Sequence, residues 1–390
     1  MTQSESEPEP PPPSRTTLRE LARLFGKLGF IAFGGPAAHI AMMEDEVVRR
    51  RRWMPHDQFL DLLGATNLIP GPNSTELAIH VGHARRGIPG LLVAGACFIL
   101  PAVAIVGAIA WVYVQYGALP EIAGVMRGIK PVIIAVVIQA LWGLGKAAVK
   151  TPFLGVVGAA AFAASLLGVN ELAVLAAAGV VVAAGRRLRA GSAASLLPLP
   201  LLGAGSATAT STATAFGLWP LFLFFLKVGS VLFGSGYVLL AFLRNDLVEH
   251  FHWLTESQLL DAIAVGQITP GPVFTTATFI GYVLGGAAGA GVATLGIFLP
   301  AFVFVAISGP LIPRLRRSRT AGAVLDGINV ASLALMAVVT LQLGRTAIVD
   351  VPTALLAAAS AFVLIRWRPN SAWLVLAGGI AGAALTYAPW

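Results

Sequence analysis

The sequence predicts an all-α polytopic membrane protein built from two homologous halves. Of its 390 residues, 57% are apolar and only 11% are charged, whereas soluble domains are about 45–50% apolar and about 25% charged. Apolar runs of roughly 18 residues or more, long enough to cross a bilayer, recur along most of the chain. The third observation is an internal repeat that relates the beginning of the chain to its second half.

The repeat starts in a glycine-rich segment. Residues 25–36 return as residues 225–236, at an offset of 200. The match continues without a gap, pairing Trp53 with Trp253, Gln58 with Gln258, Asp61 with Asp261 and Thr75 with Thr275. After one deleted residue the offset is 199, and the Leu-Pro-Ala of residues 100–102 matches that of residues 299–301. Because proline and polar residues match in register, a shared apolar composition does not explain the repeat.

The repeat divides the chain into four parts. Residues 1–19 are an acidic, proline-rich tail, which is expected to be disordered. Residues 20–189 are the first half and residues 217–390 are the second. Residues 190–216, rich in Ser, Thr, Ala and Gly, are predicted to be a linker.

The net charge of +8 does not indicate a nucleic-acid-binding protein. The arginines occur in short clusters between apolar runs, as in the cytoplasmic loops of membrane proteins, and form no single basic face. No nucleic-acid partner is therefore expected, and the lipid bilayer is the expected surrounding. Cys97 is the single cysteine, which excludes an internal disulfide.

Membrane-spanning helices are predicted in both halves. In the first half they are residues 88–111, 124–144, 153–167 and 172–184. In the second half they are residues 218–240, 290–312, 323–343, 353–365 and 372–387.

One further segment in each half is interrupted. Residues 58–83 and 258–283 each contain Pro-Gly-Pro near the middle. Proline removes an amide donor and clashes with the preceding turn, so the helix must break there. A break at membrane depth is tolerated only where it faces protein or a water-filled cavity. Matched breaks in two halves are typical of a transporter's binding site, whereas the alternative is a packing kink without function.

Each break is predicted to be a re-entrant turn that binds an anion. A new helix begins after each Pro-Gly-Pro, so free backbone amides and the positive end of the helix dipole face the break. Small polar side chains flank it. The predicted substrate-binding residues here are Asn67, Pro70, Gly71, Pro72, Asn73, Ser74 and Thr75, with Gln267, Thr269, Pro270, Gly271, Pro272, Thr275 and Thr276 in the second half.

A second pair of motifs is predicted to contribute to the same site. These are Gly34, Gly35 and Pro36, with His39 after them, and Gly234, Ser235 and Gly236. Lys27 and Lys227 lie two turns upstream, each inside an apolar run. A matched intramembrane lysine is a candidate anion ligand, and we expect both ammonium groups to be free of a competing carboxylate. The alternative is that each lysine only snorkels to the membrane interface.

Other candidates are weaker. Glu76 follows the first break and is a candidate for carrying a coupling proton, although its position in the second half holds threonine. His80 and His83 share a helix face, but no carboxylate or cysteine completes a metal set. We expect no metal, no cofactor and no catalytic group. The sequence contains no phosphate-binding loop, so the chain is not expected to hydrolyse ATP.

The charged loops predict an inverted repeat. The loop after the first glycine motif carries Arg49, Arg50, Arg51 and Arg52. Its counterpart carries Arg244 among Asp246, Glu249, His250 and His252. Because cytoplasmic loops are the basic ones, this asymmetry favours opposite orientations of the two halves.

These motifs resemble the chromate ion transporter family over nearly the whole chain. The resemblance rests on Phe-Gly-Gly-Pro at residues 33–36, the Glu-x-x-x-Arg-Arg-Arg-Trp stretch of residues 46–53, and Pro-Gly-Pro. It implies export of chromate across a bacterial inner membrane, and chromate resistance. The functional positions it implies are Gly34, Gly35, Pro36, His39, Glu46, Arg52, Trp53, Pro70, Gly71, Pro72 and Asn73.

Two alternatives stay open. Sulfate is a near-isosteric dianion, and a pocket of amides and hydroxyls separates such isosteres poorly. Sulfate is therefore the alternative substrate, and a homodimer is an open alternative for the assembly. The second half departs from the family motif at Ser235, Gly236, Leu239 and His252, which bears on whether the two halves contribute equally.

Overall fold

The first half consists of helices joined by short turns. The computed structural model describes residues 16–33, 35–117, 119–189, 216–232, 238–308, 318–367 and 369–386. Its first elements are α1 (Leu18–Ile31), α2 (Pro36–Glu44), a π-helical turn (Asp45–Arg50), α3 (His56–Thr66), α4 (Asn73–Tyr116), α5 (Pro120–Ala148), α6 (Pro152–Leu166) and α7 (Glu171–Arg189). Of the predicted linker, residues 190–216, only Phe216 lies within the described residues. Gly217, the next residue, precedes α8.

The second half repeats this order. Its elements are α8 (Leu218–Val231), α9 (Leu239–Leu243), a π-helical turn (Arg244–His250), α10 (Glu256–Ile268), a single 3₁₀ turn (Val273–Thr275), α11 (Thr276–Ser308), α13 (Arg319–Ala347), α14 (Val351–Trp367) and α15 (Ser371–Thr386). Every element among the described residues is helical, which confirms the predicted all-α class.

The helix starts follow from local sequence. Thr17 and Glu20 form a capping box at α1, and Thr255 and Gln258 form one at α10, so side chains satisfy amides that lack a helical partner. Proline occupies the first turn of α2, α5 and α6, where its missing donor costs little. The helix α1 begins at Leu18, inside the predicted tail, and residues 1–15 of that tail lie outside the described residues.

Four helices in the described part of the chain are long and apolar enough to cross a membrane. They are Asn73–Tyr116, Ile122–Ala148, Val273–Ser308 and Thr320–Ala347. Four further apolar helices are shorter: Pro152–Leu166, Leu218–Val231, Val351–Trp367 and Ser371–Ala384. Together they make the chain a multi-pass membrane protein.

Both α4 and α11 fold back on themselves. In α4, Arg86 and Gly87 have non-helical backbone angles, with φ of +61° at Gly87, and Gly286 in α11 has φ of +60°. A Cβ atom added to Gly95 would lie 2.9 Å from the side chain of Ile79. In a straight helix those residues would be about 24 Å apart, so α4 reverses direction between them. Each long helix is thus a hairpin, and its turn lies between two segments that the sequence predicts to be separate: residues 58–83 and 88–111 in α4, and residues 258–283 and 290–312 in α11.

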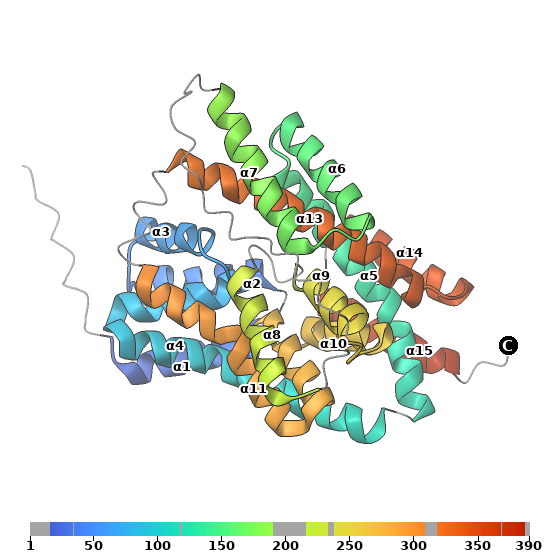
Figure 1. The fold of residues 1–390 in the computed structure, drawn as a ribbon. Helices are drawn as coiled ribbons and strands as arrows, with labels where there is room; N and C mark the ends of the chain where they lie inside the picture. The colour runs from blue at the N-terminus through green and yellow to red at the C-terminus, as the bar shows by residue number, and fades with distance from the viewer. Residues whose placement is uncertain are drawn as a thin grey trace, which may run out of the picture.

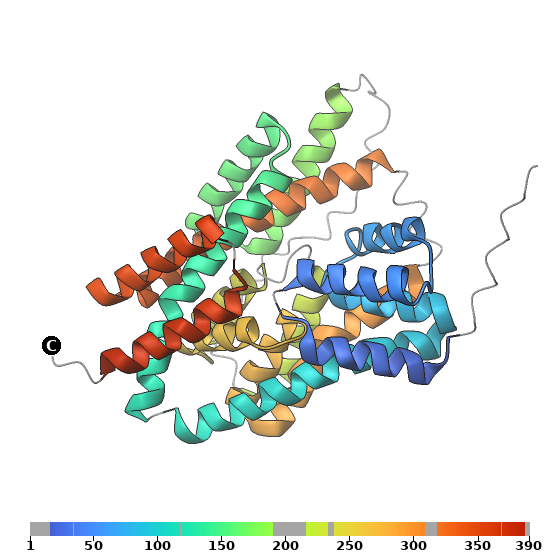
Figure 2. The same ribbon diagram turned by 180° about the vertical axis from the view of Figure 1, so that it is seen from behind.

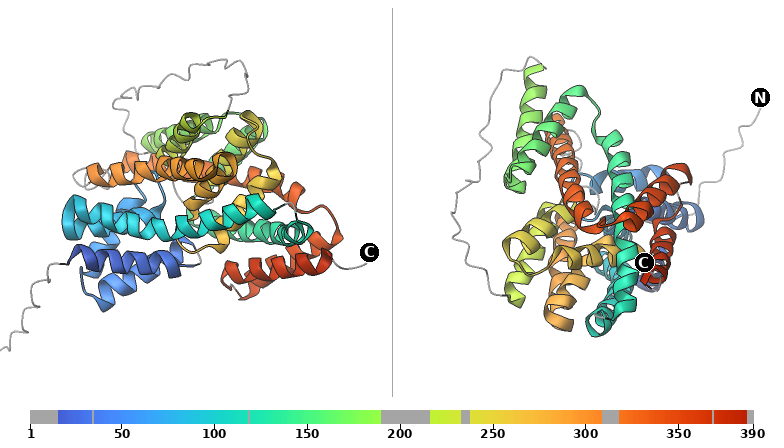
Figure 3. Two further views of the ribbon diagram at one scale, coloured as in Figure 1. Left: turned by 90° about the horizontal axis from the view of Figure 1, so that it is seen from below. Right: turned by 90° about the vertical axis from the view of Figure 1, so that its right-hand side faces the viewer.

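The two halves interlock. The hairpins α4 and α11 pack on each other, α1 packs on α4 and α8 packs on α11. Figure 3 shows α1 and α4 lying side by side. Beyond this centre the halves exchange partners: α13 packs against α6 and α7 of the first half (Figure 1), and α5 packs against α14 and α15 of the second (Figure 2). Neither half is therefore a separate packing unit.

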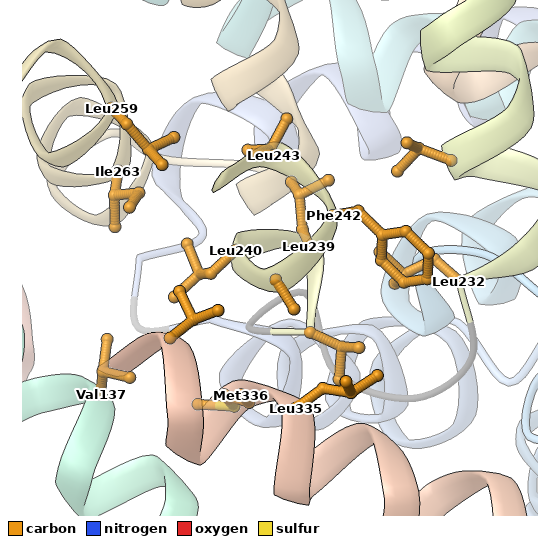
Figure 4. Close-up of a cluster of buried hydrophobic side chains, with 14 of the residues drawn as sticks. Val137, Leu232, Leu239, Leu240, Phe242, Leu243, Leu259, Ile263, Leu335 and Met336 are labelled. Carbon is orange, nitrogen blue, oxygen red and sulfur yellow. The ribbon is translucent and has the colours of Figure 1, made fainter. Parts of the chain in front are cut away.

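The largest apolar cluster surrounds the short helix α9. Leu239, Leu240, Phe242 and Leu243 are buried there against residues of α5, α10 and α13 (Figure 4). The prediction of one continuous helix over residues 218–240 is wrong, because α8 ends at Val231 and Leu232 is extended. The Leu232 carbonyl group is therefore not part of the α8 hydrogen-bond pattern and can accept a hydrogen bond from another element.

Candidate functional site

The first Pro-Gly-Pro separates α3 from α4. The helix α3 ends with Asn67 as its C-cap, and α4 starts at Asn73 with Pro72 as its N-cap. The side chain of Asn73 donates a 2.9 Å hydrogen bond to the Asn67 side-chain oxygen across the break. The helix break that proline predicts is therefore present, and the second break likewise separates α10 from α11.

Each break is hydrogen-bonded to the other half of the chain, and the two contacts are equivalent. The Gly71 amide donates to the Leu232 carbonyl at 2.8 Å, and the Gly271 amide donates to the Ala32 carbonyl at 2.9 Å. Ala32 and Leu232 are the C-cap residues of α1 and α8, and they match in the repeat. A contact in which equivalent groups exchange roles is the mark of a two-fold relation. The repeat in the sequence thus appears as a local pseudo-two-fold at the breaks.

His39 joins this contact from one side only. Its imidazole is buried, with Nε2 3.0 Å from the Ala32 carbonyl oxygen and Nδ1 3.2 Å from the Ser74 hydroxyl. Because a carbonyl only accepts, Nε2 carries the proton and Nδ1 accepts from Ser74. His39 therefore connects the first turn of α4 to the carbonyl that holds Gly271. Leu239 occupies the equivalent position in α9.

The first break contains unpartnered polar atoms. Among the described residues, the Thr75 hydroxyl, the Asn73 side-chain oxygen and both Glu76 carboxyl oxygens are buried without a hydrogen-bond partner. Glu76 is fully buried and lies against the turn, since a Cβ atom added to Gly71 would be 2.3 Å from its Oε1. The carboxyl group therefore lies at the start of α4, where the sequence predicted an anion to bind.

The second break uses its hydroxyl groups internally. Thr269 donates to the Val265 carbonyl, Thr275 to the Pro272 carbonyl and Thr276 to the Val273 carbonyl, each at 2.8 Å. Gln267 is also buried. The two breaks thus differ: the first holds unsatisfied polar atoms, whereas the hydroxyl hydrogens of the second are committed to its own backbone.

The expectation that the lysines lack a competing carboxylate is wrong. The Lys27 ammonium lies 2.9 Å from Glu46 Oε1, and that of Lys227 lies 2.8 Å from Asp246 Oδ2. The lysine side chains are 49% and 42% exposed. Hydrogen bonding from Lys27 holds the pKa of Glu46 below its usual range. The acidic partners also match in the repeat, and a spacing of 19 residues in both halves was the signal that sequence reasoning missed.

The remaining family positions include Trp53, Gly35 and Pro36. Trp53 is buried, with its carbonyl accepting a 2.6 Å hydrogen bond from Arg85 and its ring 5.2 Å from the Arg51 guanidinium carbon. Gly35 is the N-cap of α2, and Pro36 begins that helix. Gly34, Gly234, Ser235 and Gly236 lie outside the described residues. The described residues contain no cluster of three metal-binding side chains, and His80 and His83 belong to none.

Known proteins resemble this chain along both halves. The family model described as "Chromate transporter" matches residues 19–183 and again residues 219–383. A chromate transport protein of Cupriavidus metallidurans is 32% identical over 376 residues, covering 93% of this chain and 91% of its own. A probable chromate transport protein of Synechococcus elongatus is 31% identical, covering 94% and 95%. A chromate transport protein of Pseudomonas aeruginosa is 32% identical, covering 93% and 91%. No solved structure matches.

Proposed function

The chain belongs to the chromate transporter family, and we propose that it is a secondary transporter that exports chromate across a bacterial inner membrane and so confers chromate resistance. The observation that carries the proposal is the reciprocal contact of the two breaks through Gly71 and Gly271. Irregular backbone inside a helical membrane protein needs a protein or aqueous environment. Placing both breaks against the opposite half supports one shared transport site between the halves.

The orientation of the halves is part of the proposal. A pseudo-two-fold axis that lies in the membrane plane relates inverted halves. The basic turn with Arg49 and Arg50 and the mixed turn with Glu249 and His250 would then face opposite sides. In this arrangement the breaks meet at membrane depth and act as re-entrant turns. Rocking of the two hairpins about this point would expose the site to each side in turn.

The transported anion binds at the breaks, mainly at the first. The helix α4 starts there with amides that have no helical carbonyl to bond, and the Thr75 hydroxyl is buried there without a partner among the described residues. The dianion needs these donors, but the Glu76 carboxyl group lies in the same place. We assign the coupling proton to Glu76, because a neutral carboxylic acid removes the repulsion between its charge and the substrate.

Flux of radiolabelled chromate into everted membrane vesicles tests the function. Vesicles that contain the protein should accumulate chromate above an empty-vector control, because the cytoplasmic face of an everted vesicle points outward. Cells producing the protein should also grow at higher chromate concentrations. Vesicles loaded no faster than the control would contradict transport, and uptake only in right-side-out vesicles would contradict export. Unlabelled sulfate added as a competitor measures selectivity between the two dianions.

A further inference from the structure

A buried ion pair joins the first half to the second broken segment, away from both breaks. The Lys130 ammonium of α5 lies 3.1 Å from Asp261 Oδ1 of α10, and the two side chains are 15% and 6% exposed. Lys130 also donates to the Ser257 hydroxyl at 2.5 Å, and the Tyr113 hydroxyl of α4 donates to Asp261 Oδ2 at 2.8 Å. Seven residues separate Asp261 from the end of α10 at Ile268, which places the pair about 10 Å from the second break.

The pair is incompletely satisfied. Asp261 Oδ1 is buried and accepts no hydrogen bond, because its approach to Lys130 has the distance but not the direction of one. A buried ion pair offsets its desolvation only when its remaining atoms are hydrogen-bonded. Lys130 lies inside the apolar helix Ile122–Ala148, where a charged side chain is costly. Simple stabilisation therefore does not account for these charges.

The arrangement occurs on one side of the molecule only. Gly128 and Ile129 match Gly327 and Ile328 in the repeat, but Asn329 stands in the place of Lys130. Asp61, the counterpart of Asp261, is exposed on α3. A duplicated structural feature would have its counterpart in the other half, and this cation has none.

The cation can be reached without unfolding the helices. Ser257, which accepts from Lys130, is exposed in the first turn of α10, so one side of the ammonium group faces the N-terminal end of that helix. The nearby carboxylate Glu256 is already engaged by Arg244 and the Thr346 hydroxyl. Tyr113 would keep a hydrogen bond on Asp261 when the lysine turns away.

We propose that Lys130 is a further oxyanion subsite on the transport route, in which its ammonium group leaves Asp261 and binds the travelling dianion. The inference rests on the proposed function. Asp261 occupies the lysine in the empty transporter and competes with the anion for it. Once it has left Asp261, the lysine offers the anion a full positive charge. Lys27 and Lys227 cannot do this, because they are paired with Glu46 and Asp246.

Neutral variants of the pair separate this role from a structural one. Lys130→Gln should weaken chromate binding about tenfold or more, the effect of losing a charge-assisted hydrogen bond. Asp261→Asn should lower the concentration that half-saturates binding, because the competitor is gone. The double variant Lys130→Gln/Asp261→Asn should insert at the wild-type level and still bind as weakly as Lys130→Gln. Equilibrium binding of radiolabelled chromate to purified protein and flux in everted vesicles are the measurements.

The control is Lys150→Gln. Lys150 pairs with Asp326 at 3.0 Å beyond the end of α5 and is 60% exposed, so its loss removes a lysine–aspartate pair at the surface, outside the route, and Asp326 keeps Arg186 as a partner. Wild-type affinity in Lys130→Gln would overturn the subsite, and so would a double variant that regains wild-type affinity. If Lys130→Gln does not insert, the double variant and Lys130→Arg, which keeps the charge, decide between the two roles. Absence of chromate flux in the wild type would instead overturn the proposed function and the subsite with it.

Discussion

The amide of Gly71 lies 2.8 Å from the carbonyl oxygen of Leu232, a residue of the opposite half, and donates a hydrogen bond to it. The reciprocal bond from Gly271 to Ala32 makes the geometry of each break depend on the first helix of the other half. A movement of one half against the other must therefore act directly on both breaks. The predictions below start from this dependence.

Replacing the glycine of a break should stop transport. Gly71 has φ of +142° and Gly271 has φ of +86°, and an added Cβ atom would meet Glu76 at 2.3 Å or Ala102 at 2.7 Å. Strain of about 1–3 kcal/mol at such a residue must be relieved by moving the turn. We expect Gly71→Ala and Gly271→Ala to reduce chromate flux roughly tenfold or more at equal protein amounts. Gly107→Ala is the control, because nothing lies within 4 Å of its added Cβ atom. Normal flux in the two break variants would show that the breaks contribute to packing and not to transport.

Glu76→Gln should separate substrate binding from proton coupling. The amide has the shape of the protonated acid, so it should fit the buried position, where the carboxyl oxygens have no partner among the described residues. Chromate should still bind, but a pH gradient should no longer accelerate flux. The measurement is initial uptake in vesicles with and without an imposed gradient. A variant that responds to the gradient as the wild type does would remove Glu76 from the coupling step.

The ion pair of Lys27 and Glu46 should be structural. Lys27→Met leaves the Glu46 carboxylate without its closest partner, so we expect less inserted protein. Adding Glu46→Gln removes the orphaned charge and should restore both the amount of protein and its chromate affinity. Immunoblots of membrane fractions and concentration-dependent uptake check this. Affinity that stays low in the double variant, at a normal protein level, would return Lys27 to the anion site.

Repeat-matched cysteines should report opposite orientations. Arg50 and His250 are matched, exposed residues at the ends of the two π-helical turns. Each is replaced singly by cysteine in a Cys97→Ala background, which is otherwise free of thiols. An impermeant thiol reagent should label one variant in intact spheroplasts and the other in everted vesicles. Labelling of both from one side would exclude the inverted repeat.

The contact between Asp350 and Arg127 should be insensitive to mild acid. Hydrogen bonds from Thr353, and then from Arg127, lower the pKa of Asp350 to about 2. An unfolded aspartate has a pKa of about 3.9, so the stabilisation is complete above that value and is lost as the pH falls through the folded pKa. Asp350→Asn should therefore lower the unfolding temperature equally at pH 7 and pH 5, measured by scanning fluorimetry in detergent. A destabilisation that vanishes at pH 5 would contradict this assignment.

The sequence predicts the elements better than it predicts their partners. Repeated Pro-Gly-Pro is enough to place both helix breaks, because proline acts through local sterics and a missing amide. The turn at Gly87 can also be placed from the sequence, because Arg85 and Arg86 precede it and form a basic pair between two apolar segments. Pairing of Lys27 with Glu46 depends on how the π-helical turn brings two distant residues together, which hydropathy does not encode. The contact between Lys130 and Asp261 crosses the two halves, so no pattern within either half indicates it.

The exchange of helices between the halves also sets an order of assembly. The helix α5 ends at Ala148, while its partners α14 and α15 begin only at Val351. At about 5–20 residues per second, roughly 10–40 s of synthesis separate them. For that interval the side of α5 that packs on α14 and α15 has no final neighbour. A chain stopped before Val351 would leave this side of α5 permanently uncovered, so the first half reaches its final packing only when the last two helices are present.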